Sequence, residues 1–195
     1  MNKIKVFEKE LSWITNSNIR EFAEVAISRL PDYFFTVAAS STGKYHPAYA
    51  LGNGGLVRHT KAAVKIANEL LGIETFGKYS SEEKDLIITA LILHDGWKHG
   101  ENYNKYTVAE HPVVAADFVK KVNKDEKILA NEQAERLAEL IISHMGQWNT
   151  DRYKNEIMPK PNKSIQHFVH LCDYLASRKY LIFDFGDEFY LPENY

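Results

Sequence analysis

Helical periodicity recurs along almost the whole chain, whereas the alternation of apolar and polar residues that marks β-strands is nearly absent. Apolar residues return every three or four positions in successive segments, and Pro or Gly residues separate several of these segments. The segments that we expect to be helical are 18–30, 56–71, 81–95, 106–122, 131–144 and 164–180. A weakly alternating tail at 182–191 is a candidate for a small β-hairpin. The pattern therefore predicts an all-α helical bundle.

Length and composition limit the class of protein further. A chain of 195 residues fits a single domain, 1–195, whose core we expect at about 33–180. Cys172 is the only cysteine, which excludes an internal disulfide and a cysteine-rich zinc site and suggests a reducing cytoplasm. No segment resembles a secretory signal or a membrane span. The net charge of −2 provides no bulk field for a polyanion, so any phosphate recognition has to be local.

His94 and Asp95 stand side by side directly after the apolar run 86–93. A carboxylate and an imidazole next to such a core segment are costly to bury unless something compensates the charge, and a divalent cation is the usual compensation. Further ligand-type residues lie on the inner faces or at the ends of other predicted helices. The full candidate set is His59, His94, Asp95, His111, His144 and Asp173.

The chemistry of this set indicates a metal hydrolase. Several imidazoles together with carboxylates suit Mn, Fe, Ni or Co better than an all-oxygen site would, and Mg or Zn are further options. Asp95 has a spare oxygen with which it can bridge a second ion. We hypothesise that His59, His94, Asp95 and Asp173 hold one ion, and that Asp95, His111 and His144 hold another. A shared water would then become a nucleophile towards phosphorus.

The order of these residues resembles that of the HD-domain superfamily of metal-dependent phosphohydrolases, and Lys98 adds the HD-x-x-K extension that is common there. The segments 45–49 and 54–60, together with Ile142-Ser143-His144 and His170-Leu171-Cys172-Asp173, are similar to the HD domain of bacterial 3′-to-5′ exoribonucleases. The resemblance covers roughly 33–179. It implies an HD-domain helical fold, metal-dependent phosphohydrolase activity, and the involvement of the loop residues His46 and Tyr49 in substrate binding.

Two further residues are candidates for phosphate binding, and Asp95 and Lys98 are the residues that we expect to be catalytic. Lys98 and Arg58 would neutralise charge on the phosphate. Taken singly, a histidine such as His59 is more often a hydrogen-bonded core residue than a ligand, and Asp173 alone could be an ion-pair partner. The occurrence of all six candidate ligands on or next to successive predicted helices favours a metal site far more strongly than any one of these residues does.

The sequence thus predicts an enzyme that hydrolyses a phosphoester or phosphodiester of a nucleotide or short oligonucleotide. A free-standing domain of balanced charge suits a small nucleotide better than a long RNA. Two alternatives remain open at this point. One is a mixed-valence di-iron oxygenase, because some HD-fold proteins use the same ligands for that chemistry. The other is a regulatory module that binds metal without turnover. The oligomeric state cannot be derived from the sequence.

Overall fold

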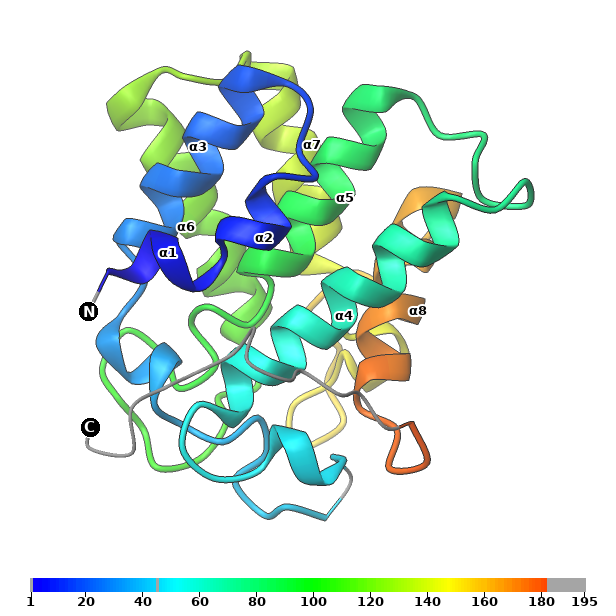
Figure 1. The fold of residues 1–195 in the computed structure, drawn as a ribbon. Coiled ribbons are helices and arrows are strands. Elements are labelled where there is room, and N and C mark those ends of the chain that lie inside the picture. Colours follow the sequence, from blue (N-terminus) through cyan, green and yellow to red (C-terminus); the bar gives the residue numbers. More distant parts are fainter. Residues whose placement is uncertain (1, 45, 182–195) are drawn as a thin grey trace.

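The computed structural model describes residues 2–44 and 46–181, and these residues form a bundle of α-helices with short 3-10 turns between them (Figure 1). The only β-bridge within them is an isolated pair, Thr150 with Glu156. The all-α prediction is therefore confirmed for this part of the chain, while the predicted hairpin at 182–191 lies outside the described residues. The α-helices are α1 (Lys3–Val6), α2 (Glu8–Leu11), α3 (Ser17–Ser28), α4 (Gly55–Leu71), α5 (Ser81–Leu93), α6 (His111–Glu126), α7 (Asn131–Ile142) and α8 (Ser164–Ala176).

Helix α5 is the centre of the bundle. It packs against α3, α4, α7 and α8, and every residue from 85 to 93 is buried. A helix that is apolar on all sides requires neighbours on all sides, which explains why the run 86–93 carries no polar face. Its start is fixed by a capping box: Ser80 Oγ accepts from the Glu83 N–H, and the Glu83 carboxylate accepts from the Ser80 N–H.

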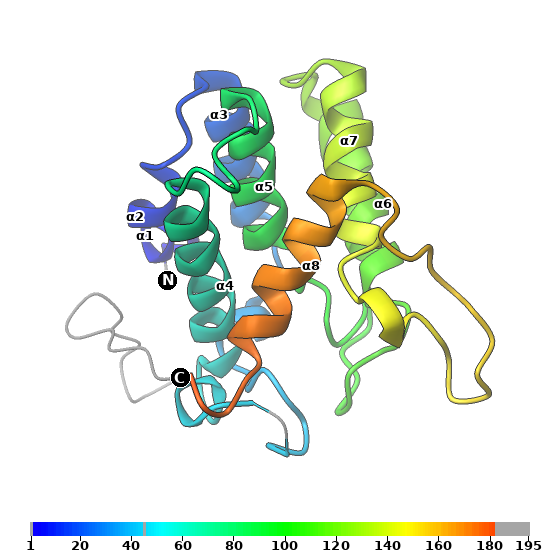
Figure 2. The ribbon, with the colours of Figure 1, turned by 90° about the vertical axis from the view of Figure 1, so that its right-hand side faces the viewer.

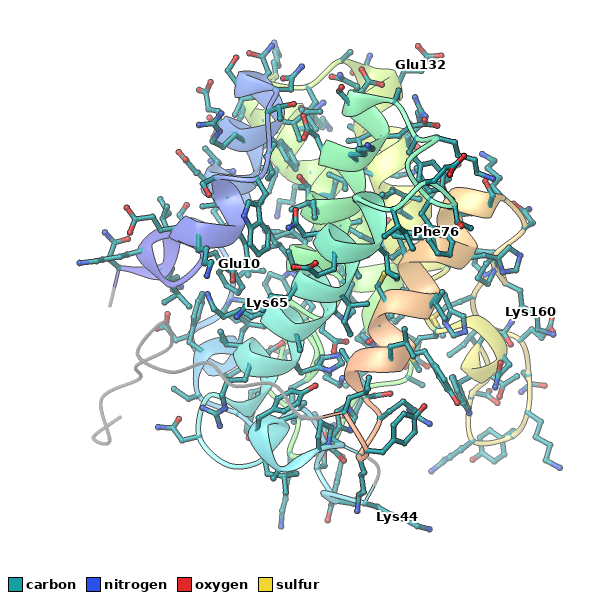
Figure 3. The ribbon with its side chains drawn as sticks, turned by 45° about the vertical axis from the view of Figure 1, so that its right-hand side comes forward. Glu10, Lys44, Lys65, Phe76, Glu132 and Lys160 are labelled. Atoms are coloured by element: carbon teal, nitrogen blue, oxygen red, sulfur yellow. The ribbon has the colours of Figure 1, made fainter. Side chains whose placement is uncertain are left out.

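Helix α8 crosses in front of α5, between α4 and the pair α6–α7 (Figure 2). The connection from α4 to α5 packs on it, because the ring of Phe76 lies 5.2 Å from that of Phe168 (Figure 3). On the other side of α4, the N-terminal segment is held by a buried ion pair, in which Lys61 Nζ lies 2.7 Å from Glu10 Oε2. None of the described helices combines the length and the apolar character needed to cross a bilayer.

Most of the predicted helices occur, but several of their bounds differ. The helix predicted at 106–122 begins only at His111, because Pro112 lacks an N–H and fits only the first turn, and it continues to Glu126. The helices predicted to reach 144 and 180 end at Ile142 and Ala176. Two short helices, α1 and α2, and the 3-10 turns Asp32–Phe35, Ala48–Ala50 and η3 (Gly146–Trp148) were not predicted. Such short elements have too few residues to show a period.

Candidate metal centre

Six side chains from five separate stretches converge at one end of the bundle, where α4 and α6 begin and α5, α7 and α8 end (Figures 1 and 2). They are supplied by α4, the end of α5, the start of α6, the turn after α7, and α8. These are the predicted ligands His59, His94, Asp95, His111, His144 and Asp173. All are buried except Asp173, whose side chain is 17% exposed.

The distances between these side chains match those expected of ligands around a common cation. His59 Nε2 lies 2.9 Å from Asp173 Oδ1, and His94 Nε2 lies 3.4 Å from the same oxygen. Two ligand atoms each about 2.1 Å from one ion lie about 3.0 to 3.4 Å apart in tetrahedral or octahedral geometry. His59, His94 and Asp173 form one group that could hold an ion, and His94, Asp95 and His144 form a second.

Asp95 belongs to the second group and also faces the first, because its two oxygens lie near different histidines. Oδ2 is 3.6 Å from His59 Nε2 and 3.5 Å from His94 Nε2. Oδ1 is 3.1 Å from His111 Nε2 and 3.8 Å from His144 Nε2. A carboxylate that presents one oxygen to His59 and His94 and the other to His111 and His144 has the geometry of a bridging ligand.

Three of the imidazoles are oriented by the main chain. The Nδ1 atoms of His94, His111 and His144 each lie 2.7 Å from a backbone carbonyl oxygen three residues earlier. Because a carbonyl oxygen only accepts, Nδ1 carries the hydrogen in each ring and Nε2 is left as the atom that faces the site. The carbonyls belong to Leu91, Val108 and Ile141.

The site has polar atoms that the protein alone leaves without hydrogen-bond partners. Among the described residues, Nε2 of His94, His111 and His144 and Oδ1 of Asp95 are all buried without one. With Nδ1 as the hydrogen-bearing nitrogen, Nε2 of the neutral His144 imidazole is an acceptor, and it faces the Asp95 carboxylate oxygen Oδ1, which is also an acceptor, at 3.8 Å. Unpaired buried polar groups are costly, and a divalent cation would satisfy all of them together. The donor set therefore fits a metal ion.

The electrostatics of the site also favour a cation. Burial alone would raise the pKa of Asp95, but the charges of Lys98 and His94 and the contact with His111 hold it well below its usual value. The pKa of Asp173 is likewise held low against burial by His59 and His94. His144 behaves in the opposite way, because burial and the nearby charge of His94 lower its pKa to about 3, so its imidazole is neutral. Two carboxylates and a neutral imidazole are thus in the states that bind metal.

The other predicted site residues lie around this centre in different ways. Lys98 Nζ is 2.5 Å from Asp95 Oδ2, so it reaches the centre. His46 packs edge-on against His59, with ring centroids 5.1 Å apart. Tyr49 donates its hydroxyl to the carbonyl of Ala176 at the end of α8. The Arg58 guanidinium donates to backbone carbonyls of the loop before α4, namely those of Tyr49, Leu51 and Asn53.

These contacts give Tyr49 and Arg58 a role in holding the loop 48–54 against α4 and α8. Their participation in substrate binding stays a prediction. Trp97, two residues after Asp95, packs on Phe118 with ring centroids 5.4 Å apart, so its partly buried ring lies against the core. Cys172 is fully buried, as expected of a small core residue.

Sequence reasoning missed a group of side chains beside the centre. His170 Nδ1 lies 2.6 Å from the backbone carbonyl of His144, so His170 supports a ligand's main chain and not its ring. Trp148, Tyr174 and Arg178 gather next to His170 and were not singled out. The spacing of His170, Tyr174 and Arg178 by four residues was the available signal, because residues so spaced share one face of the helix predicted at 164–180, although the observed α8 ends at Ala176.

The fold and the centre together define a helical domain with a candidate metal centre built around a His-Asp pair. The family model of the HD domain matches residues 56–178, which is most of the chain and includes all six candidate ligands. The protein belongs to the HD-domain family, whose members are generally hydrolases. Comparisons with curated proteins and with solved structures gave no match.

Proposed function

We propose that this protein is a metal-dependent phosphohydrolase that cleaves a phosphoester or phosphodiester of a nucleotide or short nucleic acid. The observation that carries the proposal is the convergence of buried ring nitrogens of His94, His111 and His144 and a carboxylate oxygen of Asp95, all without hydrogen-bond partners, on one place. The likeness of several segments to the HD domain of bacterial 3′-to-5′ exoribonucleases supports a phosphodiester of a nucleotide as the substrate.

The six candidate ligands would hold one or two divalent ions, with Asp95 as the residue common to both. When bound, such ions lower the pKa of a coordinated water and neutralise charge on phosphate oxygens. The metals that suit this mixture of imidazoles and carboxylates are Mn, Fe, Ni and Co, with Mg or Zn as further options.

The protein's own groups would orient the reactants. The main-chain carbonyls that bind Nδ1 of three histidines keep their Nε2 atoms directed at the centre. Lys98 is 11% exposed and holds its ammonium against the bridging carboxylate, where it would meet a phosphate oxygen arriving at the site. Asp173 is the most exposed ligand, so we expect the substrate to enter beside α8.

The test combines metal analysis with an assay of hydrolysis. Purified protein should contain Mn, Fe, Ni or Co and should hydrolyse bis(p-nitrophenyl) phosphate or members of a nucleotide panel. Asp95→Ala should lose both the metal and the turnover, because it removes the carboxylate whose two oxygens face the histidines on both sides of the centre. The matched control is Asp117→Ala, which changes an exposed aspartate of α6.

Three results would overturn the proposal. Equal metal content in the wild type and in Asp95→Ala would contradict the assignment of the site. Metal binding without hydrolysis of any phosphoester would indicate a regulatory module. Turnover that required iron and dioxygen would indicate an oxygenase that uses the same ligands.

A further inference from the structure

Beside the metal centre, an exposed aromatic side chain is held in a fixed stack. Trp148 is 46% exposed and its ring is nearly parallel to that of Tyr174, at 11° with centroids 5.7 Å apart. The Arg178 guanidinium lies over the Tyr174 ring, with Cζ 4.1 Å from the centroid. Planar groups of this kind, with an adjacent guanidinium, are the surfaces on which proteins stack nucleobases.

The stack is attached to two of the candidate ligands. Tyr174 follows Asp173 directly in α8, and its ring lies 6.2 Å from that of His170, which contacts the backbone of His144. Trp148 follows His144 by four residues, and His170 joins them: its Nδ1 contacts the His144 carbonyl, and its ring centroid is 6.1 Å from that of Trp148. The stack therefore adjoins the centre next to its most exposed ligand, Asp173.

Trp148 is rigidly placed by its neighbours. Gly146 adopts a φ of +60° and lies against the His170 ring so closely that a Cβ there would be 2.3 Å from Cε1. The next residue after Trp148, Asn149, is buried and donates to the Met158 carbonyl at 2.8 Å. The η3 turn thus lies beside α8, and the loop that projects away from α8 after it is closed at its base by the bond from Asn149 to Met158 (Figure 2). An exposed ring held in this way loses little freedom when a ligand stacks on it.

We propose that Trp148, Tyr174 and Arg178 form a stacking surface for the base of a nucleotide whose phosphate lies at the metal centre. The proposal rests on the phosphohydrolase function proposed above and adds to it the part of the substrate that is recognised. Exposed aromatics elsewhere are placed differently: the ring of Tyr103, which is 60% exposed, stacks on His99 in the loop between α5 and α6.

The first test compares two diester substrates, the p-nitrophenyl ester of a nucleoside 5′-monophosphate and methyl p-nitrophenyl phosphate, which has no base. Trp148→Ala should raise the KM for the nucleoside ester about 10-fold, because a stacked base is lost, and should leave the KM for the methyl ester unchanged. Trp148→Phe keeps a stacking ring and should restore most of the loss. The control, Tyr153→Ala, removes an exposed aromatic of the same segment and should change neither substrate.

The second test measures binding without turnover. Adenosine 5′-monophosphate should quench the tryptophan fluorescence of the wild-type protein, ribose 5-phosphate should not, and the quench should vanish in Trp148→Phe. Equal effects of Trp148→Ala on both esters, no effect on either, or a quench that survives in Trp148→Phe would overturn the stacking surface. If neither ester is hydrolysed, the phosphohydrolase proposal fails, and the nucleotide-specific quench alone then decides whether the surface binds a base.

Discussion

Lys98 and Asp95 form a close ion pair at the centre of the site, with Nζ 2.5 Å from Oδ2 across three residues of chain. The ammonium therefore touches the carboxylate that faces both groups of histidines. A charge in this position can compensate Asp95 in the absence of metal and can meet a phosphate in its presence.

Lys98→Met should reduce kcat/KM for phosphodiesters by about 10²-fold, because it removes a positively charged donor aimed at developing negative charge. We expect the bound metal to remain, since the ligand set is unchanged, and Lys98→Arg to retain part of the activity. Steady-state kinetics with metal analysis on the same samples would check this. Loss of metal in Lys98→Met, as in Asp95→Ala, would show that Lys98 acts only by positioning Asp95.

His144→Ala and His59→Ala should affect different ions. His144 Nε2 faces Oδ1 of Asp95, whereas His59 Nε2 faces Oδ2 and Asp173. In a Mn²⁺ titration, His144→Ala should abolish binding of the more weakly bound ion and leave the more tightly bound ion in place. His59→Ala should weaken binding of the more tightly bound ion. His167→Ala, on the exposed face of α8, is the control. A single equivalent in the wild type would refute the two-ion arrangement.

Metal binding should become stronger as the pH rises. Burial would lower the pKa of His94, but the negative charges of Asp95 and Asp173 outweigh it and raise the pKa to about 10. Because coordination requires the neutral imidazole, each ion that binds Nε2 below that pH displaces a proton. Calorimetric titration with Mn²⁺ in buffers of different ionisation enthalpy should detect proton release near neutrality. An affinity that does not change between about pH 6 and about pH 8 would contradict this.

Gly146→Ala should destabilise the fold more than Gly52→Ala does. Both glycines have a positive φ, +60° and +67°, so the backbone strain of an alanine is similar at the two positions. Only at Gly146 would the new Cβ clash, because it would lie 2.3 Å from the His170 ring, whereas Gly52 faces open space. We expect an additional loss of about 2 kcal/mol, measured by urea unfolding. Equal losses would mean that His170 moves aside without cost.

Asp85→Ala should release the N-terminal segment from the bundle. The buried carboxylate of Asp85 accepts three hydrogen bonds, from the backbone N–H groups of Thr15 and Asn16 and from the Thr15 hydroxyl. Truncation leaves these donors without a partner and should cost about 3 kcal/mol, while Asp85→Asn keeps an acceptor and should cost less. Thermal unfolding would measure both, with Asp117→Asn as an exposed control. A change within about 0.5 kcal/mol for Asp85→Ala would contradict the prediction.

The fold class was predictable because long amphipathic helices repeat their period many times, and the central helix α5 stands out as an unbroken apolar run. The ligand types were predictable because each lies on or next to such a helix. The ends of the helices were harder to predict from the sequence. That α7 ends at Ile142 and that the following turn directs His144 inward is seen only in the three-dimensional structure.

Sequence could not reveal the contacts made by polar side chains to the main chain. Nothing in the composition of the loop before α4 indicates that Arg58 binds its carbonyls, because that requires the loop to fold back on the helix. The stacking surface was missed for the same reason, since Trp148 and Tyr174 lie 26 residues apart in the chain.

The hydrogen bonds from His94, His111 and His144 to backbone carbonyls have a consequence for substitutions. A carbonyl oxygen is present whatever side chain its residue carries, so substitution of Leu91, Val108 or Ile141 by another apolar residue removes no ligand support. The orientation of these imidazoles therefore depends on the path of the main chain and not on the identity of the three side chains.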